Sequence, residues 1–445
     1  MVTSDLIIIG AGPGGYRAAE HAARHGLSVV IIEKEHAGGT CLNCGCIPTK
    51  TLARNAEVML TLKESEVFGI QTGEPTVDFQ QVMARKQQVV EQLRSGVETL
   101  MKQPGITLVY GTASFQDAHT VVVGEEQYTA KNIIIATGSD AKMLPLPGID
   151  QEHVITSTEL LELKEIPQRL CIVGAGVIGM EFASVFSSFG TEVTVVEFLK
   201  ECLPTIDSDI AKRLRQTISK RGVEFFMQSG VKAIEGHEVV FERKGKEQRV
   251  EADLILIATG RKPRLDDLKL ENAGVEFSPR GINVDDRLQT NVEGIYAIGD
   301  VNARCMLAHA ATMQGIHVVN EILGKSDDID LSIMPAAIFT YPEAASVGLS
   351  EDQCKAQEME YVCKKGFFRS NGKALAMNET DGMMKLLTDA EGKIIGCHVF
   401  GPHAADIVQE VSALMCKHTT VRELQDMVHI HPTLGELVQE VSMQF

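Results

Sequence analysis

The sequence predicts an α/β fold, because two short apolar runs each end in a glycine-rich turn and are followed by a helical pattern and a second apolar strand. The first copy has its glycines at residues 10–15 and ends its second strand at Glu33. The second copy has its glycines at residues 174–179 and ends its second strand at Glu197. The first glycine and the acid are 23 positions apart in both copies. The chain therefore contains an internal repeat that keeps its register.

A repeat of this kind suits a dinucleotide. The first glycine allows the tight turn, the second lets the backbone approach a pyrophosphate, and the third lets the helix pack on the strand. The helix N-terminus offers N–H groups and a positive dipole end to the phosphates, and the acid can accept hydrogen bonds from a ribose 2′-OH. These roles fall on Gly10, Gly12 and Gly15 in the first copy and on Gly174, Gly176 and Gly179 in the second. We therefore predict two Rossmann-like dinucleotide-binding domains.

The second repeat favours NAD over NADP. The carboxylate of Glu197 would repel a 2′-phosphate, and NADP sites usually place an arginine nearby. Lys200 is the only cation close to Glu197 in the sequence, and we interpret it as a solvated surface residue.

The rest of the chain supplies the remaining elements. Three further apolar runs end in glycine and should return to the sheets, at residues 133–138, 254–260 and 294–299. Residues 79–103 have helical periodicity. After Pro335, strand-like runs at 385–387 and 394–400 precede a helical pattern at 404–418, which predicts a separate α+β domain. We predict four domains: a first dinucleotide-binding domain (1–146), a second (147–264), a central domain (265–333) and a C-terminal interface domain that dimerises (334–445).

Composition limits the partners and the compartment. The 445 residues carry a formal net charge of −18, and nucleic-acid binding needs a positive surface, so we expect no nucleic-acid partner. No apolar run reaches the roughly 18 residues of a membrane span, and no basic leader precedes the first strand. Most of the ten cysteines are isolated in the sequence. A large chain needs no disulfide framework, so we expect a reducing cytoplasm.

Three cysteines, Cys41, Cys44 and Cys46, lie within six positions. On a continuous helix, Cα atoms three residues apart are separated by about 5 Å and those five apart by about 8.7 Å, whereas a disulfide rarely spans more than about 7 Å. Spacing alone therefore favours Cys41–Cys44. Gly45 can relax the backbone, so Cys41–Cys46 stays possible if the segment is a distorted turn. No second cysteine or histidine pair lies nearby at zinc-ligand spacing, so we expect no metal.

Residues 38–50, GGTCLNCGCIPTK, resemble the redox segment of the FAD-dependent pyridine nucleotide–disulfide oxidoreductases. In that family four residues separate the active cysteines and a lysine follows four residues after the second, which places these roles on Cys41, Cys46 and Lys50. Cys44 falls where the family usually has an apolar residue and would be a small filler. The resemblance covers essentially the whole chain. Later motifs narrow it to the branch that oxidises dihydrolipoamide: GVIGME at 176–181, TGRKP at 259–263, YAIGD at 296–300, MLAH at 306–309, YPEAASVG at 341–348 and HIHPTLGE at 429–436.

The resemblance also assigns the cofactor sites. FAD would be held by Gly10, Gly12, Gly15, Glu33, Thr40, Lys50, Gly111, Thr137, Gly138, Ser139, Asp300, Met306, Leu307, Ala308 and His309. NAD would be held by Gly174, Gly176, Gly179, Glu197, Val231 and Gly260. Asp300 would contact the ribityl region of the flavin, and Lys50 and Glu181 would form an ion pair beside the isoalloxazine ring.

In the catalytic roles that the resemblance implies, Cys41 is the thiol that meets the substrate and Cys46 is the thiolate that lies against the flavin. His431, supported by Glu436, would be the base and would come from the opposite subunit, so that each active site of a homodimer is shared. The chemistry needs these residue types, because the attacking thiol must lose its proton near neutral pH. A carboxylate on the second ring nitrogen fixes the tautomer of such a base. For His429, His418 and His403 we expect exposed or already bonded side chains.

The activity that the resemblance implies is oxidation of protein-bound dihydrolipoamide by NAD+ through FAD. The partner would be a lipoyl carrier domain, together with the dihydrolipoyl acyltransferase of a 2-oxoacid dehydrogenase complex or the carrier protein of the glycine cleavage system. One alternative is a disulfide reductase of another specificity, and another is a flavoprotein binding component that has lost the redox reaction. The chain also departs from its relatives near the flavin turn, where Gln314 and Ala310 stand in place of the usual glutamate and lysine.

Overall fold

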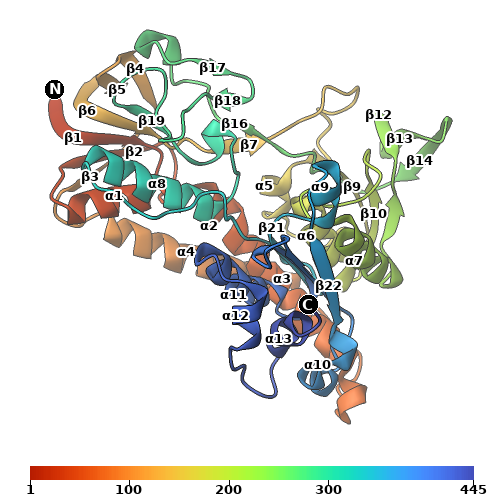
Figure 1. The fold of residues 1–445 in the computed structure, drawn as a ribbon. Coiled ribbons are helices and arrows are strands. Elements are labelled where there is room, and N and C mark those ends of the chain that lie inside the picture. The colour runs from red at the N-terminus through yellow and green to blue at the C-terminus, as the bar shows by residue number, and fades with distance from the viewer. The chain divides into compact units, whose positions relative to one another are not determined.

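The computed structural model describes residues 1–445, which form two units (Figure 1). The first unit contains Met1–Thr51, Met83–Lys142 and Gly260–Leu331. The second contains Leu52–Val82, Met143–Thr259 and Ser332–Phe445. Each unit therefore holds one copy of the glycine repeat. The four domain ranges drawn from the sequence stay predictions.

The first unit is built on a seven-stranded sheet in the order β3-β2-β1-β6-β5-β4, with β19 paired to β6. Its strands are β1 (Val2–Ile9), β2 (Val29–Glu33), β3 (Ile106–Tyr110), β4 (Ala113–Asp117), β5 (Thr120–Val123), β6 (Glu126–Ile135) and β19 (Ile295–Ala297). The central strands are parallel, so that Ile9 lies beside Ile32 and Ile135. Their apolar residues are buried, as both faces of a parallel sheet require. The returns to the sheet predicted at residues 133–138 and 294–299 are β6 and β19.

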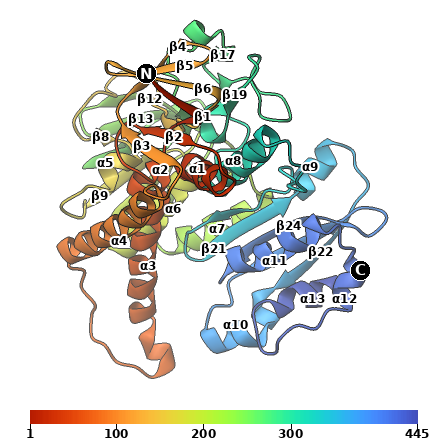
Figure 2. The same ribbon diagram turned by 90° about the vertical axis from the view of Figure 1, so that its left-hand side faces the viewer.

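Helices cover this sheet. The glycine turn leads into α1 (Pro13–Arg24), which lies beside α8 (Ala308–Ile322) in Figures 1 and 2. The two helices approach closely, because a Cβ at Gly14 would lie 2.9 Å from the carbonyl oxygen of Ala311. Shorter elements are α2 (Gly39–Cys44), η2 (Leu270–Ala273), η3 (Gly299–Asn302) and the strand pairs β7 (Ser139–Ala141) with β16 (Arg261–Pro263) and β17 (Phe277–Ser278) with β18 (Gly281–Ile282). Two helices have residues in both units, α3 (Cys46–Lys63) and α4 (Phe79–Leu100). The helix predicted over 79–103 is α4.

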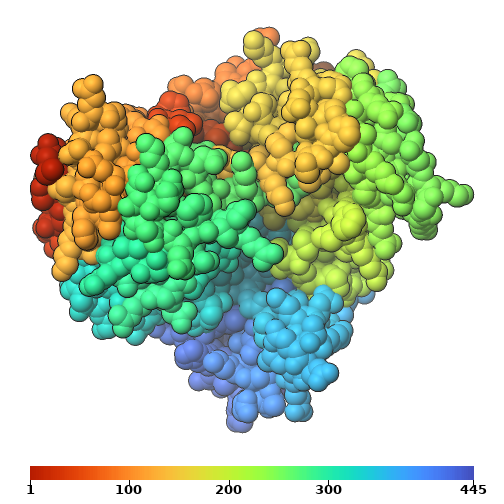
Figure 3. All heavy atoms as spheres, turned by 90° about the horizontal axis from the view of Figure 1, so that it is seen from above, coloured from red at the N-terminus to blue at the C-terminus, as the bar shows by residue number.

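The second repeat lies in a five-stranded parallel sheet of the second unit, in the order β11-β10-β9-β15-β8. Its elements are β8 (Val154–Ile155), α5 (Ser157–Leu160), β9 (Arg169–Val173), α6 (Val177–Ser188), β10 (Glu192–Val196), α7 (Ser208–Lys220), β11 (Glu224–Phe226) and β15 (Leu254–Ile257). A separate antiparallel sheet of β12 (Ser229–Glu235), β13 (Glu238–Arg243) and β14 (Lys246–Glu251) projects from it, in green in Figures 1 and 3.

The C-terminal part of the second unit is the predicted α+β region. Its antiparallel sheet has the order β20-β21-β24-β23-β22. The strands are β20 (Ala336–Ile338), β21 (Glu343–Gly348), β22 (Val362–Phe367), β23 (Met383–Thr388) and β24 (Ile394–Gly401). The helices are α9 (Glu351–Ala356), α10 (Gly372–Met377), α11 (Ala404–Cys416), α12 (Val421–Gln425) and α13 (Glu436–Ser442), with η4 (Phe368–Ser370) between β22 and α10. Apolar side chains of the sheet and of α11 and α13 share one core. None of the chain's helices combines the length and the apolar character that a membrane crossing requires.

Candidate functional site

The first glycine turn joins β1 to α1 and leaves no room for side chains. Gly10 has a φ of +106°, and a Cβ there would lie 2.3 Å from the carbonyl oxygen of Ala136. A Cβ at Gly15 would lie 1.9 Å from the carbonyl oxygen of Gly10. Gly12 differs, because the nearest atom to a Cβ there is the Cα of Gly39 at 4.0 Å. Gly12 is therefore the point at which a ligand can approach the backbone at the start of α1.

The second turn, between β9 and α6, repeats this backbone. Gly174 has a φ of +107°, and its Cβ would lie 2.5 Å from the carbonyl oxygen of Ala258. A Cβ at Gly179 would lie 2.0 Å from the carbonyl oxygen of Gly174. No atom lies within 4 Å of a Cβ built at Gly176. The N-terminus of α6 is therefore open to a phosphate group.

Both acids at the ends of the repeats are bound to their own glycine turn. Each carboxylate is held by two backbone N–H groups: those of Ala11 (2.7 Å) and Glu35 (2.9 Å) for Glu33, and those of Ala175 (2.5 Å) and Leu199 (2.7 Å) for Glu197. An ionised carboxylate has about four acceptor positions, so each acid keeps positions for a ribose hydroxyl. The equivalence that the sequence predicts for the two copies is thus present at the level of single hydrogen bonds.

The cysteine segment is a broken helix. Its first part, α2, ends at Cys44, and α3 begins at Cys46. Gly45 connects them with its backbone folded against the preceding turn, because a Cβ there would lie 2.9 Å from the carbonyl oxygen of Thr40 and 3.2 Å from the Cα of Cys41. The absence of a side chain at Gly45 is therefore what lets the second helix begin beside the first.

This break brings the thiols of Cys41 and Cys46 together. A hydrogen bond between the two thiols and the burial of the site raise the pKa of Cys41, whereas the charge of Lys50 lowers it. The spacing argument for Cys41–Cys44 assumed a continuous helix, and the segment is not one. Cys44, the last residue of α2, is half-buried. The geometry supports a Cys41–Cys46 redox pair, which stays a prediction.

His431 and Glu436 lie beside one another near the C-terminus. The Nδ1 atom of His431 lies 2.8 Å from Oε1 of Glu436, whose Oε2 accepts a hydrogen bond of 2.7 Å from the N–H of Thr433. These hydrogen bonds, the one from Thr433 first, hold the pKa of Glu436 below its ordinary value. With Nδ1–H donating to the carboxylate, Nε2 is left as the proton acceptor. His429, in contrast, is largely buried and lies 2.8 Å from Glu410, as expected for an already bonded side chain.

The chain was compared with known protein families. Residues 4–315 match the family described as pyridine nucleotide-disulphide oxidoreductase. The chain belongs to this family. Residues 334–442 match the dimerisation domain of the same family, which supports a homodimer.

The relatives of this oxidoreductase agree with the family. It is 41% identical over 99% of its length to a dihydrolipoyl dehydrogenase of Bacillus subtilis, of which 96% is covered. It is 38% identical, again over 99% of its length, to the dihydrolipoyl dehydrogenase of Geobacillus stearothermophilus (96% covered) and to the mitochondrial one of Pisum sativum (91% covered). A solved structure, the Cu(II) complex of the HOCl-induced flavoprotein disulfide reductase RclA of Escherichia coli, is 30% identical with a TM-score of 0.89 and full coverage of both chains. The family prediction and the fold class are confirmed.

The residues predicted to hold FAD in this oxidoreductase include a polar cluster beside β7. The hydroxyl of Ser139 donates to Oδ2 of Asp300 at 2.5 Å. Arg261 donates to the hydroxyl of Ser139 at 2.7 Å and to its carbonyl oxygen at 2.5 Å. The sequence interpretation gave no role to Arg261, although it directly follows the strand-ending Gly260. The sequence did offer a signal: the apolar runs at 133–138 and 254–260 both end in Thr-Gly, and Ser139 and Arg261 are the residues that follow them.

Gln314 on α8 is a second residue whose role the sequence did not show. Its Oε1 accepts hydrogen bonds from the N–H of Gly299 (2.7 Å) and from the side chain of Asn302 (3.2 Å). A neutral amide at this position therefore fixes the turn that carries Asp300. The segment with Met306 and Leu307 leads into the N-terminus of α8, where Leu307 occupies the N-cap position without a side-chain cap hydrogen bond.

Both cofactors fit the residues present. The backbone at Gly12 and Gly176 is accessible at the start of a helix, and Gly138 and Gly260, with φ of +73° and +110°, have no atom within 4 Å of an added Cβ. Such unfilled glycine positions beside a carboxylate suit a nucleotide.

Other predicted site residues lie on elements of both units. Thr40 is on α2, Lys50 is on α3, Gly111 follows β3, Val231 is on β12 and Glu181 is on α6. Glu181 is buried, and its Oε1 accepts a hydrogen bond of 2.9 Å from the N–H of Phe339. Lys50 and Glu181 belong to different units, so their ion pair stays a prediction.

Proposed function

We propose that this oxidoreductase is a dihydrolipoyl dehydrogenase, which oxidises dihydrolipoamide and reduces NAD+. The observation that carries the proposal is the contact of the Cys41 and Cys46 thiols at the helix break. It occurs in a chain that is 41% identical to a dihydrolipoyl dehydrogenase over nearly its whole length.

The cysteines exchange electrons with the substrate in two steps. A substrate thiolate attacks Sγ of Cys41 in the Cys41–Cys46 disulfide, forms a mixed disulfide and releases Cys46 as a thiolate. The second substrate thiol then attacks the substrate sulfur of the mixed disulfide, closes the lipoamide ring and releases Cys41. The enzyme is left with two thiols and two more electrons. The hydrogen bond from Cys46 and burial raise the pKa of Cys41, and the charge of Lys50 offsets part of that rise.

His431 takes the proton of the substrate thiol. Glu436 accepts from Nδ1–H, so Nε2 is free to act as the base. The His431 side chain is 81% exposed, and its neighbours Val428 and Ile430 are exposed apolar residues. Exposed apolar side chains around an exposed base fit a subunit interface. The base therefore acts in the site of the partner subunit of a homodimer.

Each nucleotide has its own residues. The chemistry that bound FAD would supply is the transfer of an electron pair between the enzyme dithiol and NAD+. The start of α1, Glu33 and the Ser139–Asp300 pair hold FAD. The start of α6 and Glu197 bind NAD, whose free 2′-hydroxyl suits an acceptor carboxylate.

The physiological substrate is a lipoyl group on a carrier domain, in a 2-oxoacid dehydrogenase complex or in the glycine cleavage system. A net charge of −18 would suit a basic docking segment on the acyltransferase. The cysteine content fits a cytoplasmic enzyme.

One assay tests the proposal against the alternatives. The purified protein is examined for the visible spectrum of a bound flavin and for turnover with dihydrolipoamide plus NAD+, in parallel with glutathione disulfide plus NADPH. We expect a flavin spectrum and rapid reduction of NAD+. Turnover only with NADPH would indicate a disulfide reductase of another specificity, the class to which the 30% identical RclA belongs. A bound flavin without either reaction would indicate a binding component.

A further inference from the structure

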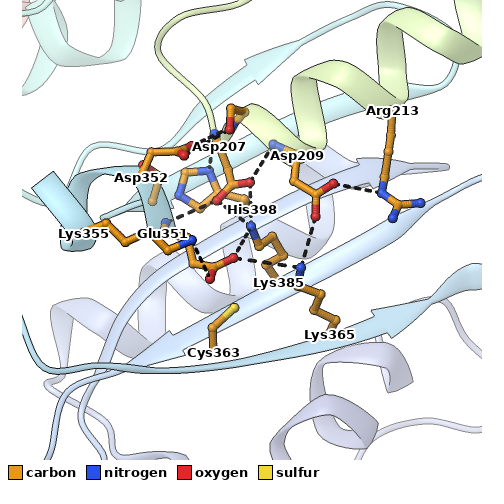
Figure 4. Close-up of polar contacts among 12 residues, drawn as sticks. Asp207, Asp209, Arg213, Glu351, Asp352, Lys355, Cys363, Lys365, Lys385 and His398 are labelled. Carbon is orange, nitrogen blue, oxygen red and sulfur yellow. Dashed lines mark hydrogen bonds and ion pairs between the residues drawn. The ribbon is translucent and has the colours of Figure 1, made fainter.

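Outside the proposed active site, the second unit contains a buried ionic cluster, which we call the Asp207 cluster and define as Asp207, Glu351, Lys385 and His398 (Figure 4). Nζ of Lys385 lies 2.7 Å from each carboxylate oxygen of Asp207 and 2.6 Å from Oε2 of Glu351. The side chains of Lys385 and Asp207 are only 2% and 1% exposed. Charges as deeply buried as these persist only when each is paired, because desolvation is costly.

His398 completes the cluster as a neutral side chain. Its Nδ1 accepts a hydrogen bond of 3.3 Å from the N–H of Asp207, so its proton is on Nε2, which donates to the carbonyl oxygen of Leu349 at 3.1 Å. Burial lowers the pKa of His398, in agreement with this tautomer. The two ring nitrogens thereby bond backbone groups from two different segments.

Asp207 connects four elements. It precedes α7 and caps it, since its Oδ1 accepts from the N–H of Asp209 at 3.0 Å. Its Oδ2 accepts from the N–H of Glu351, the first residue of α9, at 3.2 Å. Lys385 and His398 belong to β23 and β24 of the dimerisation domain. Asp207 thus bonds the start of α7 to α9 and, through Lys385 and His398, to the sheet of that domain, beside the ion pair that Asp209 makes with Lys365 of β22.

The segment before Asp207 lies against the second glycine turn. Residues 197–207 begin with Glu197, which accepts from the N–H of Ala175 in the turn. Leu203 donates its N–H to the carbonyl oxygen of the same Ala175 at 2.9 Å. Both backbone groups of Ala175, between Gly174 and Gly176, are therefore held by this segment, which ends at Asp207 four residues after Leu203.

We propose that Asp207 is a positioning residue for the pyridine nucleotide, because the cluster anchors the end of segment 197–207 and so fixes Glu197 and the glycine turn. The inference rests on the proposed NAD site. Asp207 makes no hydrogen bond to the glycine turn itself and acts through Leu203 and Glu197, which do. Charge in the dimerisation sheet thereby determines how well the nucleotide turn is preorganised.

The test separates nucleotide binding from the chemistry of the thiols. The flavin-loaded dimer is made with Asp207→Asn and, as a matched control, with Asp406→Asn, which removes an exposed carboxylate from α11 of the same domain. Binding of ADP-ribose to the oxidised enzyme is measured by calorimetry. Reduction of the enzyme by dihydrolipoamide without nucleotide is followed by its visible spectrum.

We expect Asp207→Asn to weaken ADP-ribose binding about tenfold and to raise the KM for NAD+ with little change in the rate of reduction by dihydrolipoamide. Asp406→Asn should change neither. Equal ADP-ribose affinity in the variant and the wild type would overturn the inference, as would a parallel loss of both properties.

A second variant keeps the test decisive if Asp207→Asn fails to fold. Asp207→Ser also removes the charge, keeps a good helix cap and leaves Lys385 paired with Glu351. The same measurements apply to it. A wild-type enzyme that binds ADP-ribose but is not reduced by dihydrolipoamide would contradict the proposed function. The role of Asp207 would still be decided by comparing the ADP-ribose affinity of the variant with that of the wild type.

Discussion

The two glycine turns have the same backbone and different surroundings. The φ angles of Gly10 and Gly174 differ by one degree, and the acids Glu33 and Glu197 bind the turns in the same way. The first turn is backed by other parts of its unit, since Gly39 lies against Gly12 and Ala311 lies against Gly14. At Gly176 the second turn is open. The two copies thus share one hydrogen-bonding pattern and differ in how closely other segments approach the turn.

The segments after the two acids extend the comparison. In the first copy Gly38 donates its N–H to the carbonyl oxygen of Ala11 at 2.8 Å, and in the second Leu203 does the same to Ala175. After Gly38 the chain enters the cysteine helix α2, whereas after Leu203 it reaches Asp207. The same hydrogen bond to the turn is therefore followed by the cysteine helix in one copy and by a connection to the dimerisation sheet in the other.

The largest effect is expected for substitutions of Cys41 and Cys46, in the segment that follows the first turn. Cys41→Ser and Cys46→Ser should each abolish turnover of dihydrolipoamide with NAD+, because thiol exchange needs both sulfurs. Reduction of the bound flavin by NADH should remain, since it does not use the disulfide. Peptide mapping of the oxidised wild type should find Cys41 joined to Cys46, and a Cys41–Cys44 bond would refute the assignment.

The second largest effect is expected for His431, the residue proposed as the base. His431→Gln should lower kcat/KM for dihydrolipoamide by about 10²–10⁴-fold, the usual range for a general base. His429→Gln is a matched control two residues away, because His429 is already bonded to Glu410, and we expect a much smaller loss. Comparable losses in the two variants would argue against a specific role for His431.

The helix break in the first unit is the next target. Gly45→Ala should push the second helix away from the first, because the new Cβ would lie 2.9 Å from the carbonyl oxygen of Thr40. Overpacking of this kind costs about 1–3 kcal/mol. We expect slower formation of the disulfide and lower turnover, measured by thiol titration and steady-state kinetics. Gly96→Ala on α4, where a Cβ meets nothing within 4 Å, is the control.

A direct comparison of the two turns uses the glycines that face the nucleotides. Gly12→Ala and Gly176→Ala should both fold, since neither new Cβ meets a protein atom closer than 4.0 Å. Each should keep the backbone from its own pyrophosphate and weaken binding about 10–100-fold, which corresponds to the cost of one misplaced methyl group. Gly12→Ala should lose flavin on purification, and Gly176→Ala should keep flavin but bind ADP-ribose weakly. Loss of flavin in Gly176→Ala would break the assignment of the turns.

The smallest effect is expected at Cys44. Cys44→Val replaces a half-buried thiol with an apolar side chain of similar size, so turnover of dihydrolipoamide should be retained. A large loss in this variant would mean that Cys44 takes part in the exchange.

Much of this molecule was predictable because the signals are local. The glycines of each turn, the apolar strands before them and the acids 23 residues later all lie within short stretches. The positive φ of Gly10 and of Gly174 favours glycine at the start of each turn. The sequence by itself therefore determined the repeat, the two nucleotide-binding units, the α+β C-terminal region and the family.

Only the tertiary structure decided how distant or interrupted segments meet. Spacing on a continuous helix favoured Cys41–Cys44 and the family resemblance assigned Cys41 and Cys46, but only the fold-back at Gly45 gives the physical reason why Cys46 lies beside Cys41. Asp207 and Lys385 are 178 residues apart and share one buried ion pair. Such contacts depend on how whole sheets and helices pack, and a pattern of neighbouring residues does not contain that information.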